Sequence, residues 1–469
     1  MFRFLFKIIV ILALASSCIR YVPRPIDPPR LEQSYRARTL ADPNLEEFLK
    51  AFKGTLLVWP PQSMDLDTLT LLALYFSLDL DSARARLEAA QSAIVTANVR
   101  RNPSFGGAAG YTDSEASPYA FRLDPNVPFE TAGKRTYRTR RAQQLAEAAQ
   151  FSLAETAWSV RSRLRAALAD HLISNLDLDQ LIAESQIREE LVGIYEKRLE
   201  VGEASNPIVS LARTDLARVQ VEIEQVRGRI AQARAAIAGL IGLPPSALEK
   251  VQLTLANLEN PPSEEVLDLR SVQRLGLLNR LDVQRLLSEY DAAETDLQLQ
   301  IARQKPDIAL GPAYSFGEGA NTYVLVPALL LPLFDRNKGA IAESSARRTA
   351  LGAQFLSTQA KAIDEMERAL AGYRSALREL DRATTTLGVI ANREEATRRQ
   401  LEAGEADRLA VTLVRLESAV ARRSWLAALR RAHTALGGLE DAVQHPLAGA
   451  AAMPAPPAVS PRQKEGLPQ

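Results

Sequence analysis

The chain contains the stretch Arg198-Leu199-Glu200-Val201-Gly202-Glu203-Ala204, which recurs as Gln400-Leu401-Glu402-Ala403-Gly404-Glu405-Ala406. The two stretches keep the pattern Leu-Glu-x-Gly-Glu-Ala at an offset of about 200 residues. Other landmarks keep nearly the same offset and the same order: Pro103 and Pro306, Tyr111 and Tyr314, Pro128 and Pro332, and Gly239 and Gly438. Self-similarity at a fixed offset indicates a duplicated structural unit, so the sequence predicts two tandem repeats.

These repeats divide the chain into segments. We expect repeat 1 at residues 64–248 and repeat 2 at 264–447, joined by a linker at 249–263. The prolines of the N-terminal segment, residues 18–63, predict an extended chain with no element of its own at residues 19–30. Residues 448–469 are rich in alanine and proline, which predicts a disordered tail.

The N-terminus has the layout of an export signal, predicted to span residues 1–17. Arg3 and Lys7 come first, an apolar run from Ile8 to Ala15 follows, and small residues end it. The sequence therefore predicts that the mature protein leaves the cytoplasm.

Cys18 is the only cysteine, so a disulfide within the chain is impossible. The run Ala15-Ser16-Ser17-Cys18 resembles a bacterial lipobox, with Ala15 in the place of the usual leucine. This resemblance predicts lipidation at Cys18; the alternative is a cysteine that is discarded with the signal peptide. Arg20 stands where an aspartate tends to retain lipoproteins in the inner membrane, which favours the outer membrane.

Each repeat changes from helical to strand periodicity. Apolar residues recur at spacings of three and four along residues 66–100, and Asn102-Pro103 ends that pattern. Residues 119–127 then alternate apolar and polar side chains, and residues 307–316 do the same. The sequence predicts β-hairpins at 103–129 and 306–333, with strands of about ten residues that fit an outer-membrane barrel. The alternative is an amphipathic hairpin packed on a soluble core.

The alternation predicts two faces for these hairpins. One set of side chains is predicted to face lipid: Tyr119, Phe121, Leu123, Ile308, Leu310 and Tyr314. The other is predicted to face a wet lumen: Arg122, Asp124, Asp307 and Ser315. The smallest bacterial barrels need about eight strands, so a chain with two hairpins must assemble with copies of itself to span a membrane.

Long helices are predicted after each hairpin. Residues 134–192 contain neither proline nor glycine, and no proline occurs from Leu333 to His445. Gly202 and Gly404 are the expected reversal points, because glycine readily adopts the left-handed conformation that ends helices. The predicted fold is mainly α with a small transmembrane β part.

Several motifs resemble the TolC family of outer-membrane efflux proteins, particularly those of heavy-metal and related cation systems. Residues 127–135, Val-Pro-Phe-Glu-Thr-Ala-Gly-Lys-Arg, resemble the family's Glu-Thr-x-Gly-Lys-Arg segment. Residues 331–339 resemble its Pro-Leu-Phe-Asp-Arg-Asn-x-Gly segment, and residues 404–409 resemble its second helix turn. Residues 439–447 are similar to its C-terminal close, so the likeness covers about residues 59–447.

This resemblance implies a homotrimer in which each subunit gives four strands to a shared twelve-stranded barrel, while the long helices form a tube through the periplasm. It also implies three contacts: a periplasmic adaptor protein, an inner-membrane pump that is typically proton-driven, and outer-membrane lipid. In some members of the family an arginine follows the glycine of the second turn by two positions, and here Ala406 occupies that place, followed by Asp407 and Arg408. The network of side chains that closes the entrance in those members cannot therefore be assigned directly to this chain.

The repeated turns have two interpretations. The first is geometric, with glycine for the reversal and Glu and Ala to restart a helix. In the second, the tips contact the adaptor through Leu199, Glu200, Gly202, Glu203 and Ala204 in repeat 1, and through Leu401, Glu402, Gly404, Glu405 and Ala406 in repeat 2. Glu405, Asp407 and Arg408 are then predicted to hold the entrance closed.

No pattern for catalysis emerges. The formal net charge of +1 gives no support for a nucleic-acid groove or a polybasic membrane patch. His171, His433 and His445 lie far apart with no metal-ligand spacing, and we expect them at helix surfaces or caps. We therefore expect no enzyme activity, cofactor or metal site. The family resemblance implies a passive outer-membrane exit duct that exports small solutes, metal cations or drugs, from pump and adaptor to the outside. The alternatives are a type I protein-secretion duct and a non-channel periplasmic adaptor or scaffold.

Overall fold

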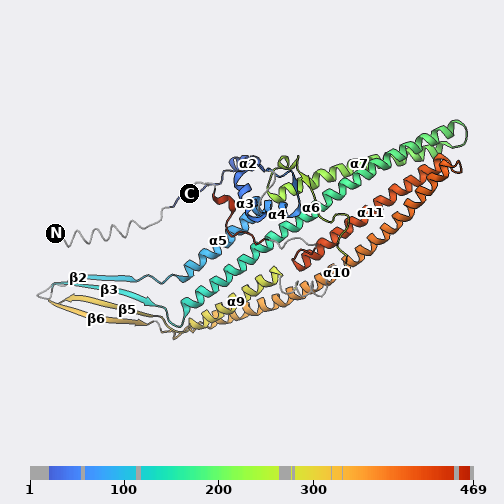
Figure 1. Ribbon diagram of the computed structural model, residues 1–469. Helices are drawn as coiled ribbons and strands as arrows, with labels where there is room; N and C mark the ends of the chain where they lie inside the picture. Colours follow the sequence, from blue (N-terminus) through green and yellow to red (C-terminus); the bar gives the residue numbers. More distant parts are fainter. Residues whose placement is uncertain are drawn as a thin grey trace.

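The computed structural model describes residues 21–53, 59–111, 113, 118–263, 276, 280–317, 319–329, 331–447 and 454–464. The molecule is elongated, with a narrow sheet at one end and two helical hairpins at the other (Figure 1). The predicted signal peptide and Cys18 lie outside the described residues, so both stay predictions.

One order of elements occurs twice: a shorter helix, two strands, a very long helix and a helix that returns. In the first copy these are α5 (Leu78–Asn98), β2 (Ser104–Tyr111), β3 (Tyr119–Phe129), α6 (Lys134–Glu200) and α7 (Asn206–Ile241). In the second they are α9 (Leu281–Ala302), β5 (Ile308–Gly317), β6 (Ala320–Leu329), α10 (Lys338–Glu402) and α11 (Arg408–Val443). The predicted fold class, mainly helical with a small β part and an internal repeat, is confirmed.

The two longest helices set the length of the molecule. Helix α6 has 67 residues and α10 has 65. At a rise of about 1.5 Å per residue, each extends roughly 100 Å. Leucines spaced by three or four along α6, such as Leu164 and Leu168, are fully buried, so the helix is held by one packed stripe and not by propensity alone.

The main core lies near the middle of the molecule, around α4 (Leu66–Phe76). This helix has buried residues on all sides, because α3, α6 and α7 surround it. Ile237 and Ile241 of α7 join the same core. Strands β1 (Ser63–Met64) and β4 (Gln252–Leu253) pair in parallel, with the short 3-10 helix η1 (Pro245–Leu248) just before β4. The connection after repeat 1 is therefore fastened to the start of that repeat.

The four longer strands form one antiparallel sheet in the order β2-β3-β5-β6. The pairing of β3 with β5 joins the two repeats, with Leu123 opposite Tyr314 and Val127 opposite Leu310. Gly311 allows this approach, because a Cβ at that position would lie 1.9 Å from the carbonyl oxygen of Pro125. The two hairpins thus behave as one sheet.

The prediction of an N-terminal segment without elements is wrong. Helices α2 (Pro28–Arg36) and α3 (Pro43–Lys53) occur there. Proline suits the first turn of a helix, where its missing N–H would have no partner, and the Asp27 carboxylate accepts a hydrogen bond from the Arg30 N–H at 3.3 Å. Leu45 and Leu49 of α3 are fully buried, which fixes this segment on the core.

The prediction of a disordered tail is also wrong for its described part. Residues 454–464 include the 3-10 helix η2 (Pro461–Lys464) and lie against α4 and α5. Arg84, which is 3% exposed, donates a hydrogen bond from Nε to the Pro457 carbonyl at 3.0 Å. Arg462 pairs with Asp81 and lies over the Phe76 ring. A buried guanidinium needs acceptors for all its N–H groups, and the tail supplies one.

Candidate functional site

The two helical reversals have the same backbone geometry. Gly202 has φ 77° and Gly404 has φ 76°, the left-handed region that favours glycine. The Glu203 N–H donates to the Arg198 carbonyl at 2.7 Å, and the Glu405 N–H donates to the Gln400 carbonyl at 2.8 Å. The predicted reversal points are confirmed, and the duplicated motif has a geometric reason in both copies.

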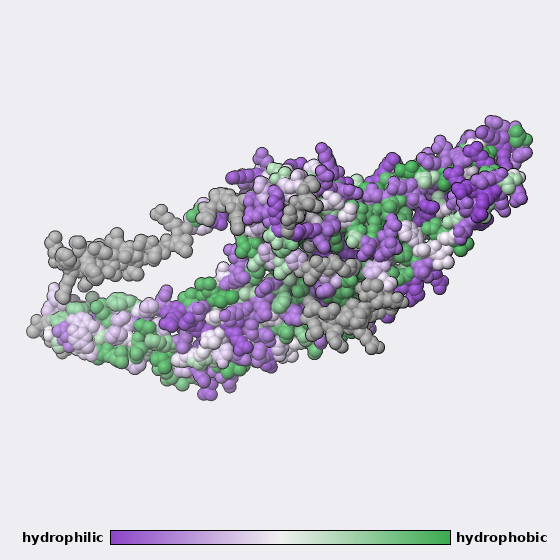
Figure 2. Space-filling view, viewed as in Figure 1, coloured by the Kyte–Doolittle hydropathy of each residue, from purple (hydrophilic) through white to green (hydrophobic). Residues whose placement is uncertain are grey.

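The reversals form the end of the molecule that lies farthest from the sheet (Figure 1). The face of this end shown in Figure 2 is mostly hydrophilic. Leu401 is 37% exposed, and the side chains of Glu402, Glu405 and Asp407 are exposed as well. The residues predicted to contact an adaptor therefore lie together at an accessible end, and contact with an adaptor stays a prediction.

Two of the predicted gate residues connect the two hairpins. Asp407 caps α11, accepting a hydrogen bond from the Ala410 N–H at 2.7 Å, and its other carboxylate oxygen lies 2.6 Å from the Arg198 guanidinium of α6. Arg408 lies 2.9 Å from the carboxylate of Glu190, also on α6. Glu405 is exposed and, among the described side chains, has no ion-pair partner. The structure therefore brings Asp407 and Arg408 into one network and leaves Glu405 outside it.

Sequence reasoning did not single out these partners on α6, Arg198 and Glu190. Glu190 also accepts from Arg415 of α11 at 2.9 Å, so one carboxylate holds two arginines of the other repeat. Deeper in the bundle, Arg423 pairs with Glu184 at 3.1 Å and with Glu222 at 2.6 Å. These partners are hundreds of residues apart, and nothing in local spacing marks them.

The ion pairs of Asp407 with Arg198 and of Glu190 with Arg408 and Arg415, which we term the tip network, depend on ionised carboxylates. Hydrogen bonds from Arg408 and Arg415 lower the pKa of Glu190, and those from the Ala410 N–H and Arg198 lower the pKa of Asp407. A lowered pKa in the folded state means that the contact contributes at neutral pH and is lost as the pH falls through the lowered value. The network is thus fully present above a pH of about 4, the ordinary carboxyl range.

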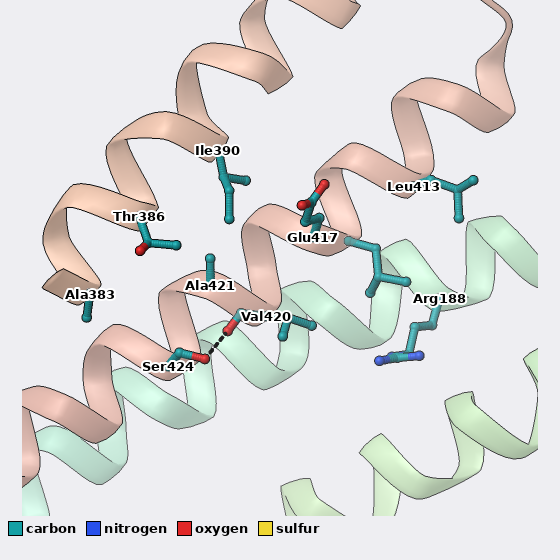
Figure 3. Close-up of a pocket in the computed structure, with 10 residues that line it drawn as sticks. Arg188, Ala383, Thr386, Ile390, Leu413, Glu417, Val420, Ala421 and Ser424 are labelled. Atoms are coloured by element: carbon teal, nitrogen blue, oxygen red, sulfur yellow. Dashed lines mark hydrogen bonds between the residues drawn. The ribbon is translucent and has the colours of Figure 1, made fainter. Parts of the chain in front are cut away.

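A shallow groove of about 550 Å³ runs along the second hairpin towards its reversal. Figure 3 shows Thr386 and Ile390 of α10 facing Ala421 of α11, while Arg188 comes from α6. Leu413 and Val420 on its wall are 41% and 44% exposed. The groove gives this charged end an apolar component.

At the other end, the sheet register puts the predicted lipid-facing and lumen-facing strand residues on opposite faces. Arg122 pairs with Ser315, while Phe121 pairs with Phe316 and Leu123 with Tyr314. Side chains of directly paired residues share a face, so the apolar set and the polar set are separated. Asp124 lies beside Arg122 on the polar face, 2.8 Å from its Nε. Which face contacts lipid stays a prediction.

Asp307 differs from its prediction. It lies one residue before β5, where its carboxylate is 2.5 Å from the Lys134 Nζ and 3.2 Å from the Arg101 guanidinium. It also accepts a hydrogen bond from the Thr131 N–H at 3.1 Å. Asp307 therefore ties the Gly-Lys-Arg motif of repeat 1 to the start of the repeat 2 hairpin, a position at the junction of strands and helices and not along a lumen face.

Two histidines also differ from the expectation of surface positions. His171 and His433 are 5% and 4% exposed, and burial lowers the pKa of both. The His433 Nε2 lies 2.6 Å from the Leu258 carbonyl, so the imidazole is a packing element between repeat 2 and the linker.

Within the described ranges, no three His, Cys, Asp or Glu side chains gather as metal ligands. Nor is any described helix long and apolar enough to cross a membrane.

Residues 70–243 match the protein family described as "Outer membrane efflux protein". The chain is 25% identical over 278 residues to the cobalt-zinc-cadmium resistance protein CzcC of Cupriavidus metallidurans, an alignment that spans 59% of this chain and 65% of the relative. Its match to that curated relative thus stops short of two thirds of the relative's length.

Two solved structures share the fold over most of their length. The outer membrane protein VceC of Vibrio cholerae is 22% identical with a TM-score of 0.64, over 81% of this chain and 95% of that chain. The CusC structure is 17% identical with a TM-score of 0.65, over 83% and 94%. The family match covers most of repeat 1, and the fold match extends beyond it over more than four fifths of the chain. Over residues 70–243 the chain is therefore similar to the outer membrane efflux protein family, and over most of its length it has the fold of the VceC and CusC structures.

Proposed function

We propose that this chain is one subunit of a passive exit duct in the outer membrane of a Gram-negative bacterium. Three copies would assemble, and solutes would leave through their shared lumen. The observation that carries the proposal is the four-stranded sheet. Strands β2 and β6 are its outer strands, and among the described residues neither has a partner on its outer side. Unpaired edges are a liability that closure into a barrel removes.

The composition of the sheet supports a membrane position for it. Aromatic side chains on the predicted lipid face are open to the surroundings: Phe105 is 70% exposed, Tyr119 66% and Tyr323 78%. A soluble protein rarely exposes such a contiguous apolar patch, whereas an outer-membrane strand has an apolar band and aromatic residues at its ends. Residues 18–20 before the described chain would add a lipid anchor through Cys18.

The proposed cargo and partners are based on the proteins that this chain resembles. The name of CzcC attributes cobalt, zinc and cadmium resistance to that protein. We place metal cations first among the small solutes exported here, with drugs second. The tips would contact a periplasmic adaptor, and an inner-membrane pump, proton-driven in our proposal, would supply the energy. A duct of this kind needs no catalytic group.

Cysteine labelling tests the position of the sheet. In a Cys18→Ser background, we expect a water-soluble thiol reagent to modify Arg122→Cys in outer membranes and to leave Leu310→Cys unmodified. The two positions lie on opposite faces, and a slip of one residue would exchange them. Equal modification of both cysteines in intact membranes would show that this sheet does not separate lipid from lumen.

The tip network predicts how the duct closes. The double variant Asp407→Ala and Arg408→Ala should raise the single-channel conductance, because it removes both contacts between the hairpins at the reversal. Acidification through the lowered pKa values of Glu190 and Asp407, which lie below the ordinary carboxyl range of about 4, should also raise the wild-type conductance, since both carboxylates then lose their charge.

Arg213→Ala is the matched control for this variant. Arg213 pairs with Glu196 at 2.6 Å within the first hairpin, and its side chain is 65% exposed. It is also an ion-paired arginine near a reversal, but it does not connect the hairpins, so its loss should leave the conductance unchanged. Equal conductance in the double variant and the wild type, with normal trimer levels, would mean that the turns only reverse the chain and do not close the duct.

A further inference from the structure

The junction between the sheet and the helices gathers positive charge. The sheet strands meet four helix ends there, namely the end of α5, the start of α6, the end of α9 and the start of α10 (Figure 1). Residues 98–103, 130–141, 303–307 and 335–348 make up this junction, which we term the collar. They contain 13 Lys and Arg against 4 Asp and Glu. The formal net charge of +1 for the whole chain therefore conceals an excess of nine in the collar and −8 elsewhere.

Part of this charge is already neutralised within the chain. Three of the four collar acids, Glu130, Asp307 and Glu343, pair with collar cations: Arg101, Lys134, Arg138 and Arg347. Two carboxylates of α9 add to them: Asp296 lies 3.4 Å from Arg141, and Glu294 lies 3.0 Å from Arg348. Even with these two included, the collar keeps an excess of seven positive charges.

The remaining cations are open to the surroundings. Seven of the 13 have no carboxylate within 4.0 Å in the described part of the chain. Six of these are exposed, and they come from all four segments of the collar: Arg100, Arg140, Arg303, Lys305, Arg336 and Lys338. Like charges at this density repel one another, so the folded state gains when an anionic partner covers them.

A group of exposed apolar side chains lies directly beside the collar in the sequence. Leu331 is 60% exposed, Leu333 69% and Phe334 fully exposed, and Arg336 and Lys338 follow within four residues. At the end of β3, Phe129 is 53% exposed just before Glu130 and the collar segment of α6. Apolar side chains followed at once by cations are typical of a chain that passes from the hydrocarbon layer to the headgroup layer of a membrane.

We propose that the collar binds the anionic headgroups of phospholipids in the periplasmic leaflet of the membrane that the sheet enters. The proposal rests on the proposed function, because the sheet must lie in a bilayer for the collar to reach its headgroups. Phosphate groups match the open guanidinium and ammonium groups, since arginine donates two parallel hydrogen bonds to a phosphate and lysine supplies a point charge. Anionic lipid thereby fixes the height of the duct in the membrane and neutralises the excess charge of each subunit.

Lipid nanodiscs test the proposal with the full-length trimer. The probe is phosphatidylglycerol mixed into phosphatidylcholine discs, and native mass spectrometry counts the phosphatidylglycerol molecules that stay bound. We expect the wild type to retain phosphatidylglycerol in preference to phosphatidylcholine and to lose that preference in high salt. The collar variant replaces five cations by glutamine, and its preference should fall by about fivefold for each cation removed: Arg100→Gln, Arg303→Gln, Lys305→Gln, Arg336→Gln and Lys338→Gln.

A matched variant removes the same number of cations from the exposed surfaces of the helices far from the sheet. None of these has a carboxylate within 4.0 Å in the described residues, and together they should leave the lipid preference unchanged: Arg229→Gln, Lys361→Gln, Arg378→Gln, Arg382→Gln and Arg422→Gln. Two results overturn the proposal. One is retention of phosphatidylglycerol by the collar variant at the wild-type level. The other is loss of trimers by the collar variant to the same degree in neutral and anionic discs. That result would mean that the collar cations pair with carboxylates of a neighbouring subunit and not with lipid.

Conductance in planar bilayers separates this proposal from the proposed function. Wild-type channels with no lipid preference would end the collar proposal and leave the duct intact. Lipid retention without any conductance would leave the collar on a membrane protein that is not a duct.

Discussion

Glu440→Ala is expected to lower the free energy of unfolding by about 3–5 kcal/mol, because it leaves buried charges without their partner. The Glu440 side chain is 3% exposed and lies 3.1 Å from the Arg165 Nε and 3.5 Å from an Arg161 nitrogen. Both arginines are buried as well, and burial lowers the pKa of Arg165 while Glu440 opposes that change. The cluster joins α6 of repeat 1 to α11 of repeat 2.

Glu379→Ala provides the comparison. Glu379 of α10 lies 2.5 Å from Arg431 of α11, but the two side chains are 47% and 55% exposed. Exposed pairs contribute about 0–1 kcal/mol, so this variant should unfold close to the wild type. Denaturant unfolding followed by circular dichroism measures both. Replacing Glu440, Arg161 and Arg165 together by Leu, Met and Met should recover most of the loss. Equal unfolding midpoints for the two single variants would mean that the buried cluster does not hold the repeats together.

Leu123→Arg is expected to cost about 2–4 kcal/mol of stability in lipid, because it puts a charge on the side of the sheet that we propose to face lipid. Leu123 pairs with Tyr314 near the middle of the sheet, on the face that carries the exposed aromatic side chains. The loss should appear as a lower yield of folded trimer when the protein refolds into phospholipid vesicles.

Val324→Arg is its matched control. Val324 is also an exposed apolar residue, but it pairs with Ala313 on the opposite face of the sheet. An arginine there would meet the water of the proposed lumen, so folded trimer should form at nearly the wild-type yield. Should Val324→Arg lower the yield more than Leu123→Arg does, the two faces are assigned in reverse.

The features that sequence reasoning predicted are those with a local or periodic signal. The repeated Gly-Glu-Ala turns, the strand alternation and the long runs without proline each depend on a few neighbouring residues, and the structure has the elements where these patterns predict them. Contacts between distant residues have no such signal. Glu190 and Arg408 are neighbours only because two hairpins lie side by side.

Composition also misled in two places. Prolines at positions 28 and 29 suggested an extended chain, but proline equally starts a helix when a capping residue precedes it, as Asp27 does. A net charge of +1 gave no support for a polybasic membrane patch, but it is the sum of an excess of nine positive charges in the collar and −8 elsewhere. Charge balance over a whole chain cannot report how its charges are distributed in space.

The conductance of the purified chain in planar lipid bilayers tests the central proposal most directly. A duct with a water-filled lumen should give discrete, ion-permeable steps without any nucleotide or proton gradient, and the Asp407→Ala and Arg408→Ala variant should give larger ones. Trimers that insert into the bilayer yet give no conductance steps, in the wild type or in the double variant, would contradict a passive duct.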